Sequence, residues 1–490
     1  MASIRQRQGQ RLPKSKQRQQ RKRQKTRAKA NRRHLRQIEE QTPTALRKFL
    51  QALGGTFTQP TYLRFVILVL AALLTVGSHT IVNVLRTVGD LAPGDVSSYH
   101  RVFSRGRWSS WDLARRLTVW VIEHFVPEGP IYLVGDDTVD EHRGKKVFGK
   151  ARHRDAVRSS HTYTAFRYGH KWVVLAVLVK FPFASRPWAL PVLTVLSPPK
   201  DDKKPKPGKR PRKTPSQQMR QMLKVLLRWF PHRTFIFAGD GGYGTHELAR
   251  TAARRPKQLK LVSRFYADAN LYRPPPARTK SKAAGRPRVK GAKLPAPQKV
   301  VAQGKRRQRL NVAWYGGGRR DVEVVTGTGQ WYKAGEGLVA VLWVYVHDCT
   351  GTHRDDYFFT TDLTMTATQV IECFTGRWSI ETTFQEMRAY VGLETTRGWK
   401  KETVMRVAQC LFGLYTVVAV LYAHLPAKYA RVRLIQWRGK KDVTFSDAIT
   451  AVRRWLWQEW VFAIPGHHAA FSKLRRPFRA ILLNALAPAA

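Results

Sequence analysis

The stretch IYLVGDD, Ile131–Asp137, marks the point at which the hydrophobic pattern of the chain changes from helical to extended. It is a short apolar run that ends in two acidic residues. The runs HKWVVLAVLVKF (170–181) and WALPVLTVLS (188–197) come after it and are typical of buried strands. An amphipathic helix, the strand-like TFIFAGD (234–240), another helix and the strand-like LKLVSRFY (259–266) come next. This order of elements predicts a mixed α/β sheet.

Both flanks of this region differ from it in composition. Residues 1–37 contain fifteen Lys and Arg and no acid, which predicts a disordered or transiently helical arm that binds phosphates, with a solubilising tail as the alternative. Between Asp268 and Asp321 there is again no acidic residue, and strand-like runs surround that basic loop. We expect six segments: a basic disordered arm (1–44), a helical DNA-binding domain (45–128), the first part of an α/β catalytic core (129–265), a β-rich basic insertion (266–362), the last core helices (363–425) and a C-terminal helical region (426–490).

The helical segment has two interpretations. Its compact helices, with basic residues on the later ones, suit a helix-turn-helix-like reader of duplex DNA. A plain helical bundle explains the same pattern equally well.

The charge balance of the chain indicates which class of molecule it binds. The chain of 490 residues has 88 Lys and Arg against 32 Asp and Glu, a formal net charge of +56. Because a compact protein with this charge repels itself unless it meets a polyanion, we expect nucleic acid as its partner.

A membrane location is not expected. The run FVILVLAALLTV (65–76) is too short for the ~20 residues that a bilayer needs, and CLFGLYTVVAVLYAHL (410–425) is better explained as a buried helix. The N-terminus lacks the apolar region of a secretory signal, and three scattered cysteines form no disulfide or zinc pattern. We expect a reducing, cytoplasmic environment.

Two aspartates end apolar strands at positions suited to catalysis. Asp136 ends IYLVGD and Asp240 ends TFIFAGD. Burying such a charge costs several kcal/mol unless it is paired or bound to metal, and ligand sites gather at the carboxyl ends of strands in open α/β sheets. A turn aspartate that caps the next helix is the structural alternative for either residue, and Asp137 competes with Asp136 because a one-residue slip reverses its direction.

A third acid lies in RWSIETTFQEMR, Arg377–Arg388. At ~100° per residue, Arg377, Glu381, Phe384 and Arg388 share one helical face. A solvated ion-pair helix would explain the charges but not the apolar residues around them. We therefore expect this face to be at least half buried.

Three carboxylates without His or Cys neighbours favour Mg²⁺ or Mn²⁺. Two such ions ~3.5–4 Å apart can activate a nucleophile and stabilise the leaving oxygen in phosphodiester cleavage. Arg377 and Arg388 would then bind DNA phosphates.

With these residues the sequence resembles a DDE transposase of bacterial insertion sequences, which has a ribonuclease-H-like catalytic domain. The resemblance covers roughly residues 130–425. It is closest to the branch whose last catalytic helix carries Tyr-x2-Arg-x3-Glu-x6-Lys. Phe374, Arg377, Glu381 and Arg388 match that spacing, with Phe in place of Tyr and Arg in place of Lys.

The resemblance implies further roles. Catalysis and metal binding fall to Asp136, Asp240 and Glu381, with Thr138 completing an Asp-x-Thr motif, and the 141-residue step from Asp240 to Glu381 leaves room for a β-rich insertion. Such enzymes bind the terminal inverted repeats of their element, cleave the ends and join the 3′-hydroxyl to target DNA as dimers or larger synaptic assemblies, so a bacterial, nucleoid-associated location is expected. The predicted DNA-contacting residues are Phe374, Arg377, Trp378, Arg388, Thr138, Lys145 and Lys146, with core packing as the alternative role of Trp378 and a solvated hairpin edge as the alternative for the two lysines.

Other constellations are weaker. His142, His153 and His161 lack regular metal-ligand spacing, which argues against zinc, and the chain has neither a P-loop nor a G-x-S-x-G elbow. A non-catalytic DNA-binding relative and a structure-selective nuclease on the same fold are the alternative functions.

Overall fold

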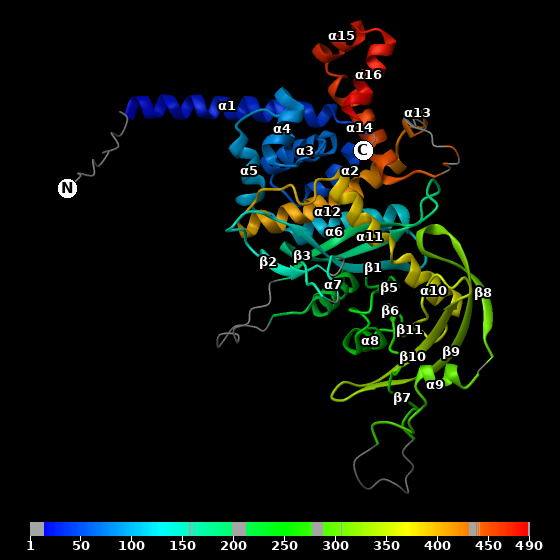
Figure 1. The fold of residues 1–490 in the computed structure, drawn as a ribbon. Helices are drawn as coiled ribbons and strands as arrows, with labels where there is room; N and C mark the ends of the chain where they lie inside the picture. The colour runs from blue at the N-terminus through cyan, green and yellow to red at the C-terminus, as the bar shows by residue number, and fades with distance from the viewer. Residues whose placement is uncertain are drawn as a thin grey trace.

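The computed structural model describes residues 14–155, 158–160, 162–197, 212–276, 288–304, 306–430, 438, 440 and 442–488. The first part of the predicted arm, most of the Pro- and Lys-rich segment before residue 215, and His161 lie outside these described residues. Within them, one large mixed sheet is covered by helices on both faces (Figure 1).

The sheet has eleven described strands in the order β2-β3-β1-β5-β6-β11-β10-β9-β7, with β4 also paired to β3 and β8 to β9. Their bounds are β1 Ile131–Glu141, β2 Ala151–Arg154, β3 Phe166–Val179, β4 Trp188–Ser197, β5 Phe235–Gly239, β6 Leu259–Arg264, β7 Leu271–Tyr272, β8 Gln308–Ala313, β9 Arg319–Lys333, β10 Gly337–Asp348 and β11 Asp356–Thr360.

The first part of the sheet has ribonuclease-H-like connectivity. Strands β1, β3 and β4 form an antiparallel meander, while β5 and β6 run parallel to β1 on its other side. Parallel neighbours need crossover connections, which α7 (Pro215–Trp229) and α8 (His246–Ala253) supply. The fold class predicted from the sequence is therefore confirmed.

The β-rich segment after β6 extends this sheet. Strand β11 pairs antiparallel with β6, and the long hairpin of β10 and β9 continues outward from β11. The free edge of β6 is thereby covered, as an exposed row of backbone donors and acceptors requires. The segment that the sequence marks as an insertion thus shares one hydrogen-bonded sheet with the strands that carry Asp136 and Asp240.

Helices from both ends of the chain cover one face of the sheet. Helices α6, α11 and α12 pack on β4, while α7 packs on β3 and β4 and α8 on β6 and β10 across the opposite face (Figure 1). The remaining bounds are α1 Lys14–Gln41, α2 Thr44–Gly54, α3 Gln59–Leu74, α4 Ile81–Val88, α5 Val96–Ser104, α6 Ser110–Phe125, α9 Pro297–Ala302, α10 Ala367–Gly376, α11 Ser379–Tyr390, α12 Lys401–Ala423, α13 Ala427–Ala430, α14 Phe445–Leu456, α15 Pro465–Lys473 and α16 Arg476–Leu486.

Helix α12 is the central helix of this layer. Its length and composition would allow it to cross a membrane, but 78% of its most apolar window is buried inside the protein. It contacts β4 and the helices α3, α5, α6 and α14. This agrees with the buried helix predicted for 410–425.

A buried arginine joins the N-terminal and C-terminal helices. Arg453 of α14 is 1% exposed. Its guanidinium donates to the carbonyls of Leu73 (2.9 Å) and Thr75 (2.9 Å) at the end of α3, and to Tyr390 (3.2 Å) at the end of α11. Unpaired carbonyls at helix ends need donors, so this one side chain stabilises three helices together.

The basic arm, expected to be disordered or transiently helical, forms an α-helix over Lys14–Gln41. Near its end, Leu35 and Ile38 are 2% and 1% exposed, and the helix contacts α3. Apolar side chains three residues apart lie on one helical face, and their burial against α3 stabilises the end of a helix whose charged residues alone would not. The strongly basic composition of the arm gave no indication that Leu35 and Ile38 would be buried.

The last predicted catalytic helix is also not straight. Helix α10 ends at Gly376 and α11 begins at Ser379, and the amides of Arg377 and Ile380 bond to carbonyls three residues earlier (3.2 and 3.0 Å). This tightened turn bends the chain at Arg377 and Trp378. It directs Arg377 toward β1.

Candidate active site

Asp136 and Asp240 lie on two neighbouring parallel strands. Asp240 directly follows the end of β5, as predicted, but Asp136 lies inside β1, because the residues up to Glu141 remain paired with β3. The prediction that Asp136 ends its strand is therefore wrong. Gly135 of β1 is in register with Gly239 of β5, so the two aspartates occupy the next level of the sheet. Neighbouring strands are ~4.8 Å apart, which places the two aspartates close together.

The side chain of Asp136 is 17% exposed, and its carboxylate faces the bend between α10 and α11. Arg377 donates from Nη1 to Asp136 Oδ2 at 3.1 Å. Burial raises the pKa of Asp136 to about 7, because desolvation and the nearby charge of Asp240 outweigh the opposing effect of Arg377. A further cation beside this carboxylate would stabilise its ionised form.

Glu381 reaches the same arginine from the first turn of α11. Arg377 Nη2 donates to Glu381 Oε1 at 2.9 Å, so one guanidinium bridges two of the three predicted catalytic acids. The Arg377 side chain is 10% exposed and that of Glu381 is 40% exposed. The three carboxylates are not among the groups of described residues whose ligand atoms all lie within 4.8 Å of one another. The guanidinium of Arg377 lies between the carboxylates of Asp136 and Glu381.

Asp240 keeps most of its acceptor capacity. Among the described residues, the backbone amide of Gly242 is the one hydrogen-bond donor to its carboxylate, at 3.0 Å. Ser263 holds the turn from behind by donating to the carbonyls of Gly239 (2.9 Å) and Asp240 (2.8 Å). A side chain held in place by its backbone, with free lone pairs, can accept a metal ion.

Asp137, the competitor of Asp136, has different partners. Its carboxylate accepts from Tyr243 (3.3 Å) and pairs with Lys171 Nζ (2.7 Å). Successive strand residues point to opposite faces, so Asp137 points away from Arg377. This geometry favours Asp136 as the metal ligand.

The motif residues Phe374 and Arg388 are both engaged inside the protein. Phe374 is 2% exposed and stacks on Phe358 with ring centroids 4.3 Å apart. Arg388 donates to Thr138 Oγ1 (2.5 Å), to the carbonyl of Val139 (3.1 Å) and to Glu394 (2.9 Å). Phe374 therefore packs in the core next to the site, and Arg388 links α11 to β1 by hydrogen bonds. Their predicted contacts with DNA stay predictions.

Of the other predicted DNA contacts, Thr138 (6% exposed) and Arg377 (8% exposed) are also engaged inside the protein, and their contacts with DNA stay predictions. The other three residues are better placed for a ligand. Lys145 and Lys146 are exposed in the loop after β1, and Trp378 is partly exposed beside Arg377.

Sequence reasoning missed three residues near the site. Arg264 at the end of β6 forms an ion pair with Asp356 (2.9 Å). Tyr315, in the turn after β8, has its pKa raised by burial and by Asp356, while Arg264 and Arg377 oppose that shift. The sequence signal for Arg264 was its place at the end of the strand next to β5, but nothing marked Tyr315, which reaches the site from the β-rich segment.

That segment is held against the catalytic helices by its backbone. The amide of Ala313 in β8 donates to Glu372 (2.8 Å), and Thr375 donates to the carbonyl of Ala313 (3.1 Å). Both side chains belong to α10. The strand end next to Tyr315 is thus fixed to the helix that precedes Arg377.

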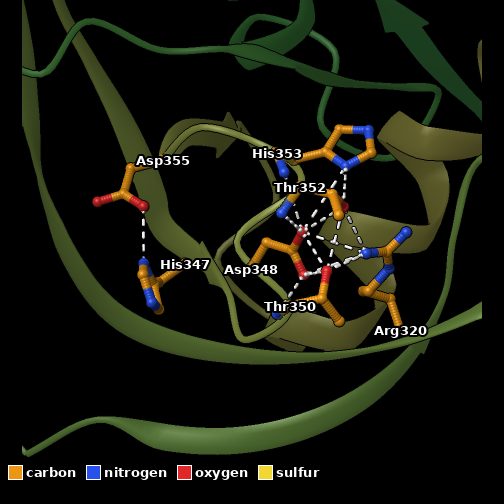
Figure 2. Close-up of polar contacts among 7 residues, drawn as sticks. All are labelled: Arg320, His347, Asp348, Thr350, Thr352, His353 and Asp355. Carbon is orange, nitrogen blue, oxygen red and sulfur yellow. Dashed lines mark hydrogen bonds and ion pairs between the residues drawn. The ribbon is translucent and has the colours of Figure 1, made fainter.

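A contrasting acid, Asp348, ends β10. It is 2% exposed and accepts hydrogen bonds from the backbone amides of Thr350 (3.1 Å), Thr352 (3.2 Å) and His353 (3.0 Å), from both threonine hydroxyls and from Arg320 (Figure 2). Burial would raise the pKa of Asp348, but these hydrogen bonds lower it well below its usual range. With its lone pairs occupied, Asp348 organises the turn and has no capacity for a ligand.

The donor set of the candidate site fits divalent cations that prefer oxygen. Asp136, Asp240 and Glu381 offer carboxylate oxygens, and two of the three have free acceptor capacity or solvent access. Mg²⁺ and Mn²⁺ prefer such ligands. Their binding requires Arg377 to release at least one carboxylate.

Comparisons with known proteins agree with this chemistry. A protein family described as "DDE superfamily endonuclease" matches residues 49–321, more than half of the chain, including Asp136 and Asp240 but ending before Glu381. No curated protein matches. Among solved structures, a piggyBac transposase synaptic complex with hairpin DNA is similar over 88% of this chain and 77% of that chain, at 9% sequence identity and a TM-score of 0.40. That likeness is too distant to assign a function.

Proposed function

The chain belongs to the DDE superfamily endonucleases, and on that premise we propose that it is a DNA transposase of the bacterial insertion-sequence type. It would bind the terminal inverted repeats of its own element, cleave the ends and join the 3′-hydroxyl to target DNA. The observation that carries this proposal is the position of Asp136 and Asp240 just beyond the last paired level of the neighbouring strands β1 and β5, with Asp136 linked to Glu381 through Arg377.

Each residue of the site has a distinct proposed role. Asp136, Asp240 and Glu381 would hold two Mg²⁺ or Mn²⁺ ions, which supply an activated nucleophile and stabilise the leaving oxygen. Before metal binding, Arg377 neutralises Asp136 and Glu381 and so limits their mutual repulsion. If metal ions were bound by these carboxylates, the Arg377 guanidinium would be available to bind the scissile phosphate in a bidentate manner.

Phe374 and Arg388 act on this site by positioning it. Phe374 packs beneath Arg377, whose guanidinium lies 5.6 Å from the ring centroid. Arg388 holds the end of β1 at Thr138 and Val139, close to Asp136 in the chain. The Phe in place of the family's Tyr therefore costs a hydroxyl but keeps the packing under the arginine.

DNA binding would spread over several basic surfaces. Helix α1, the helical segment 45–128 and the exposed Lys145 and Lys146 offer positive charge, and the net charge of +56 supports a polyanionic partner. The six segments expected from the sequence, assembly as a dimer or larger synaptic complex, and a nucleoid-associated location belong to this proposal.

Incubation of the purified protein with DNA that carries the sequences flanking its gene, with and without Mg²⁺, tests the function. We expect metal-dependent nicks that map to the element ends, followed by joining to a target plasmid. Asp136→Asn and Glu381→Gln should each lower cleavage at least a hundred-fold, because the metal contributes several kcal/mol to the barrier. End binding should persist in both variants.

Asp137→Asn is the matched control, since it changes the neighbouring acid on the other face of the sheet. Equal loss in Asp136→Asn and Asp137→Asn would contradict the assignment. Cleavage of branched DNA without joining would favour the structure-selective nuclease, and tight binding without any cleavage would favour the non-catalytic relative.

A further inference from the structure

A second polar cluster lies farther along the strand that carries Asp136. Asp140 of β1 and His170 of β3 are direct cross-strand partners, and His142 lies just past the end of β1. Asp136, Thr138 and Asp140 share one face of the strand because side chains alternate, so the cluster is about 13 Å from Asp136 along β1. It belongs neither to the proposed catalytic acids nor to the predicted DNA contacts.

The three side chains present their donor atoms to one another. His142 Nε2 is 3.2 Å from Asp140 Oδ2, and His170 Nδ1 is 3.4 Å from Asp140 Oδ1. Among the described residues, this is the single group of three or more potential metal ligands whose donor atoms all lie within 4.8 Å of one another. This cluster cannot be recognised in the sequence, because His170 comes 28 residues after His142 and only the β1–β3 register brings them together.

All three residues are removed from solvent. Asp140 is 5% exposed, His142 9% and His170 1%. The strands approach closely here, because a Cβ on Gly169 would lie 1.6 Å from the Asp140 carbonyl oxygen. A buried carboxylate and two buried imidazoles are costly to retain unless their polar atoms are paired.

The protonation of His170 leaves one of its atoms unpaired. Its Nε2 is 2.8 Å from the carbonyl oxygen of Phe148, which can only accept, so Nε2 carries the proton. In the neutral ring Nδ1 then has a bare lone pair, and this buried atom has no hydrogen-bond partner among the described residues. The lone pair faces the Asp140 carboxylate, which also carries only lone pairs. A cation between the two would turn this repulsion into attraction.

This arrangement matches the support that protein metal sites commonly have. A ligating histidine usually donates its other ring N–H to a carbonyl or carboxylate, which fixes the tautomer and the ring direction. Phe148 does this for His170. The amide of His170 also donates to Asp140 Oδ1 at 3.0 Å and so fixes the carboxylate.

A small cavity adjoins the cluster. Its volume is about 20 Å³, enough for one water-sized particle and too small for an organic ligand. Besides the three polar residues, the lining is Trp172, Leu393, Thr396, Gly398, Thr403, Val404, Val407, Ala408 and Leu411. The space therefore suits a single small ion.

We propose that Asp140, His142 and His170 bind one transition-metal cation, with Zn²⁺ as the best fit, at a site separate from the catalytic acids. Two imidazole nitrogens and one carboxylate favour Zn²⁺ over Mg²⁺, which prefers oxygen ligands. One ligand atom from each of the three residues lies within 4.8 Å of the other two, so a single cation could contact all three after small side-chain shifts.

The role of this site is structural. The cavity lining comes from β1, β3, the connection between α11 and α12, and α12 itself. The amide of Phe148 also donates to the carbonyl of Trp399 at 2.9 Å, which closes the loop carrying Lys145 and Lys146 onto the same connection. A bound ion would hold the end of β1 and this basic loop against the catalytic helices. The inference rests on the fold alone and not on the proposed transposase activity.

Metal analysis of the purified full-length protein, expressed with added zinc, tests the proposal. We expect one tightly bound Zn²⁺ per chain, lost in His142→Ala and in Asp140→Asn. His153→Ala is the matched control, because His153 lies on the adjacent strand β2 outside the cluster and should leave the zinc content unchanged. His142 lies past the strand end, so its substitution disturbs the sheet least, and circular dichroism checks that the variant is folded.

Co²⁺ titration supplies a second readout. In an Asp136→Asn background, which disables the proposed catalytic site, one equivalent of Co²⁺ should give visible absorption bands typical of a site with nitrogen ligands. His142→Ala should abolish those bands. Absence of bound zinc and of Co²⁺ bands in folded protein would overturn the proposal and leave a protonated histidine as the cation beside Asp140. Equal metal content in His142→Ala and the unchanged protein would overturn it as well.

Discussion

Asp240 and Asp348 look alike in the sequence and differ in the structure. Each ends an apolar run, TFIFAG for one and GLVAVLWVYVH for the other, in the same sheet. Asp240 receives a single described hydrogen bond on its carboxylate and stays partly exposed. Asp348 is 2% exposed and saturated by donors from its own turn and from Arg320 (Figure 2).

The turns after the two strands explain the difference. After Asp240, the glycines at 241 and 242 bring only backbone amides, and the turn is held by Ser263 through carbonyl oxygens. After Asp348, Thr350 and Thr352 each add a hydroxyl to a backbone donor. A ligand site needs lone pairs that the protein leaves free, whereas a turn aspartate uses them all.

The largest effect expected from this contrast is on catalysis. Asp240→Asn keeps the shape of the side chain but removes the charge that would hold a metal ion, so cleavage should fall roughly a thousand-fold. The free energy of unfolding should change by less than about 1 kcal/mol, because one hydrogen bond is at stake. Cleavage rates at saturating Mg²⁺ and urea unfolding of the same preparations measure both quantities.

Asp348→Asn is the matched control for that experiment. It should leave the cleavage rate per folded molecule within a few-fold of the unchanged protein. A cleavage loss at Asp348→Asn as large as that at Asp240→Asn would remove the distinction between the two acids.

The second effect is on stability. Asp348→Ala leaves Arg320 and several turn donors without their acceptor, and should lower the free energy of unfolding by about 2–3 kcal/mol. The midpoint of urea unfolding at neutral pH measures the loss. Thr352→Ala, which removes one donor and keeps the carboxylate, should cost clearly less.

The pH dependence of this loss has a defined sign. Because the folded-state pKa of Asp348 is lowered by its hydrogen bonds, the carboxylate stabilises the protein fully above its unfolded pKa, about 4. That stabilisation is lost as the pH falls toward the folded pKa. The gap between Asp348→Ala and the unchanged protein should therefore narrow in acid and be constant above about pH 5. A gap that widens in acid would contradict the assigned hydrogen bonds.

The sequence was sufficient for much of the fold. Apolar runs of strand length predicted the mixed sheet, in which β1 to β4 follow one another directly and α7 and α8 precede β5 and β6. Asp240 follows the end of β5 as predicted, whereas Asp136 lies inside β1. It could not reveal the bend at Arg377, because local helical periodicity is unchanged while tertiary contact with Asp136 decides where the chain turns. It also missed the helix at the end of the arm, where Leu35 and Ile38 are a small apolar minority.

The candidate site was less accessible to sequence reasoning than the fold. Periodicity put Glu381 and Arg377 one turn apart, but their shared contact with Asp136 spans 241 residues. Tyr315 and the pair of Asp140 with His170 depend on strand register, which single-sequence patterns do not determine. Asp240 and Asp348 differ in how many hydrogen-bond donors surround each carboxylate, and only the three-dimensional structure gives that number.

The smallest expected loss in the free energy of unfolding among the alanine variants is at Asp362, which lies just past the end of β11. In the number of donors to its carboxylate, Asp362 is intermediate between Asp240 and Asp348. Its carboxylate accepts from the amide of Thr364 (3.1 Å) and from its hydroxyl (2.7 Å), and pairs with Lys260 (2.5 Å). Fewer donors depend on it than on Asp348, and Lys260 is partly exposed, so the ion pair contributes little. Asp362→Ala should therefore lower the free energy of unfolding by about 1 kcal/mol, without affecting cleavage.

Urea unfolding of Asp348→Ala, Asp362→Ala and Asp240→Asn in one series makes this a graded test. If donors to the carboxylate determine the structural role of a strand-end aspartate, the loss of stability should decrease in that order, while the loss of cleavage should be confined to Asp240. Thr364→Ala should reproduce part of the Asp362→Ala loss, because it removes the hydroxyl donor alone. A stability loss at Asp240→Asn exceeding that at Asp362→Ala would mean that Asp240, too, acts mainly as a turn residue, and the metal-binding role would then have to be sought elsewhere at this edge of the sheet.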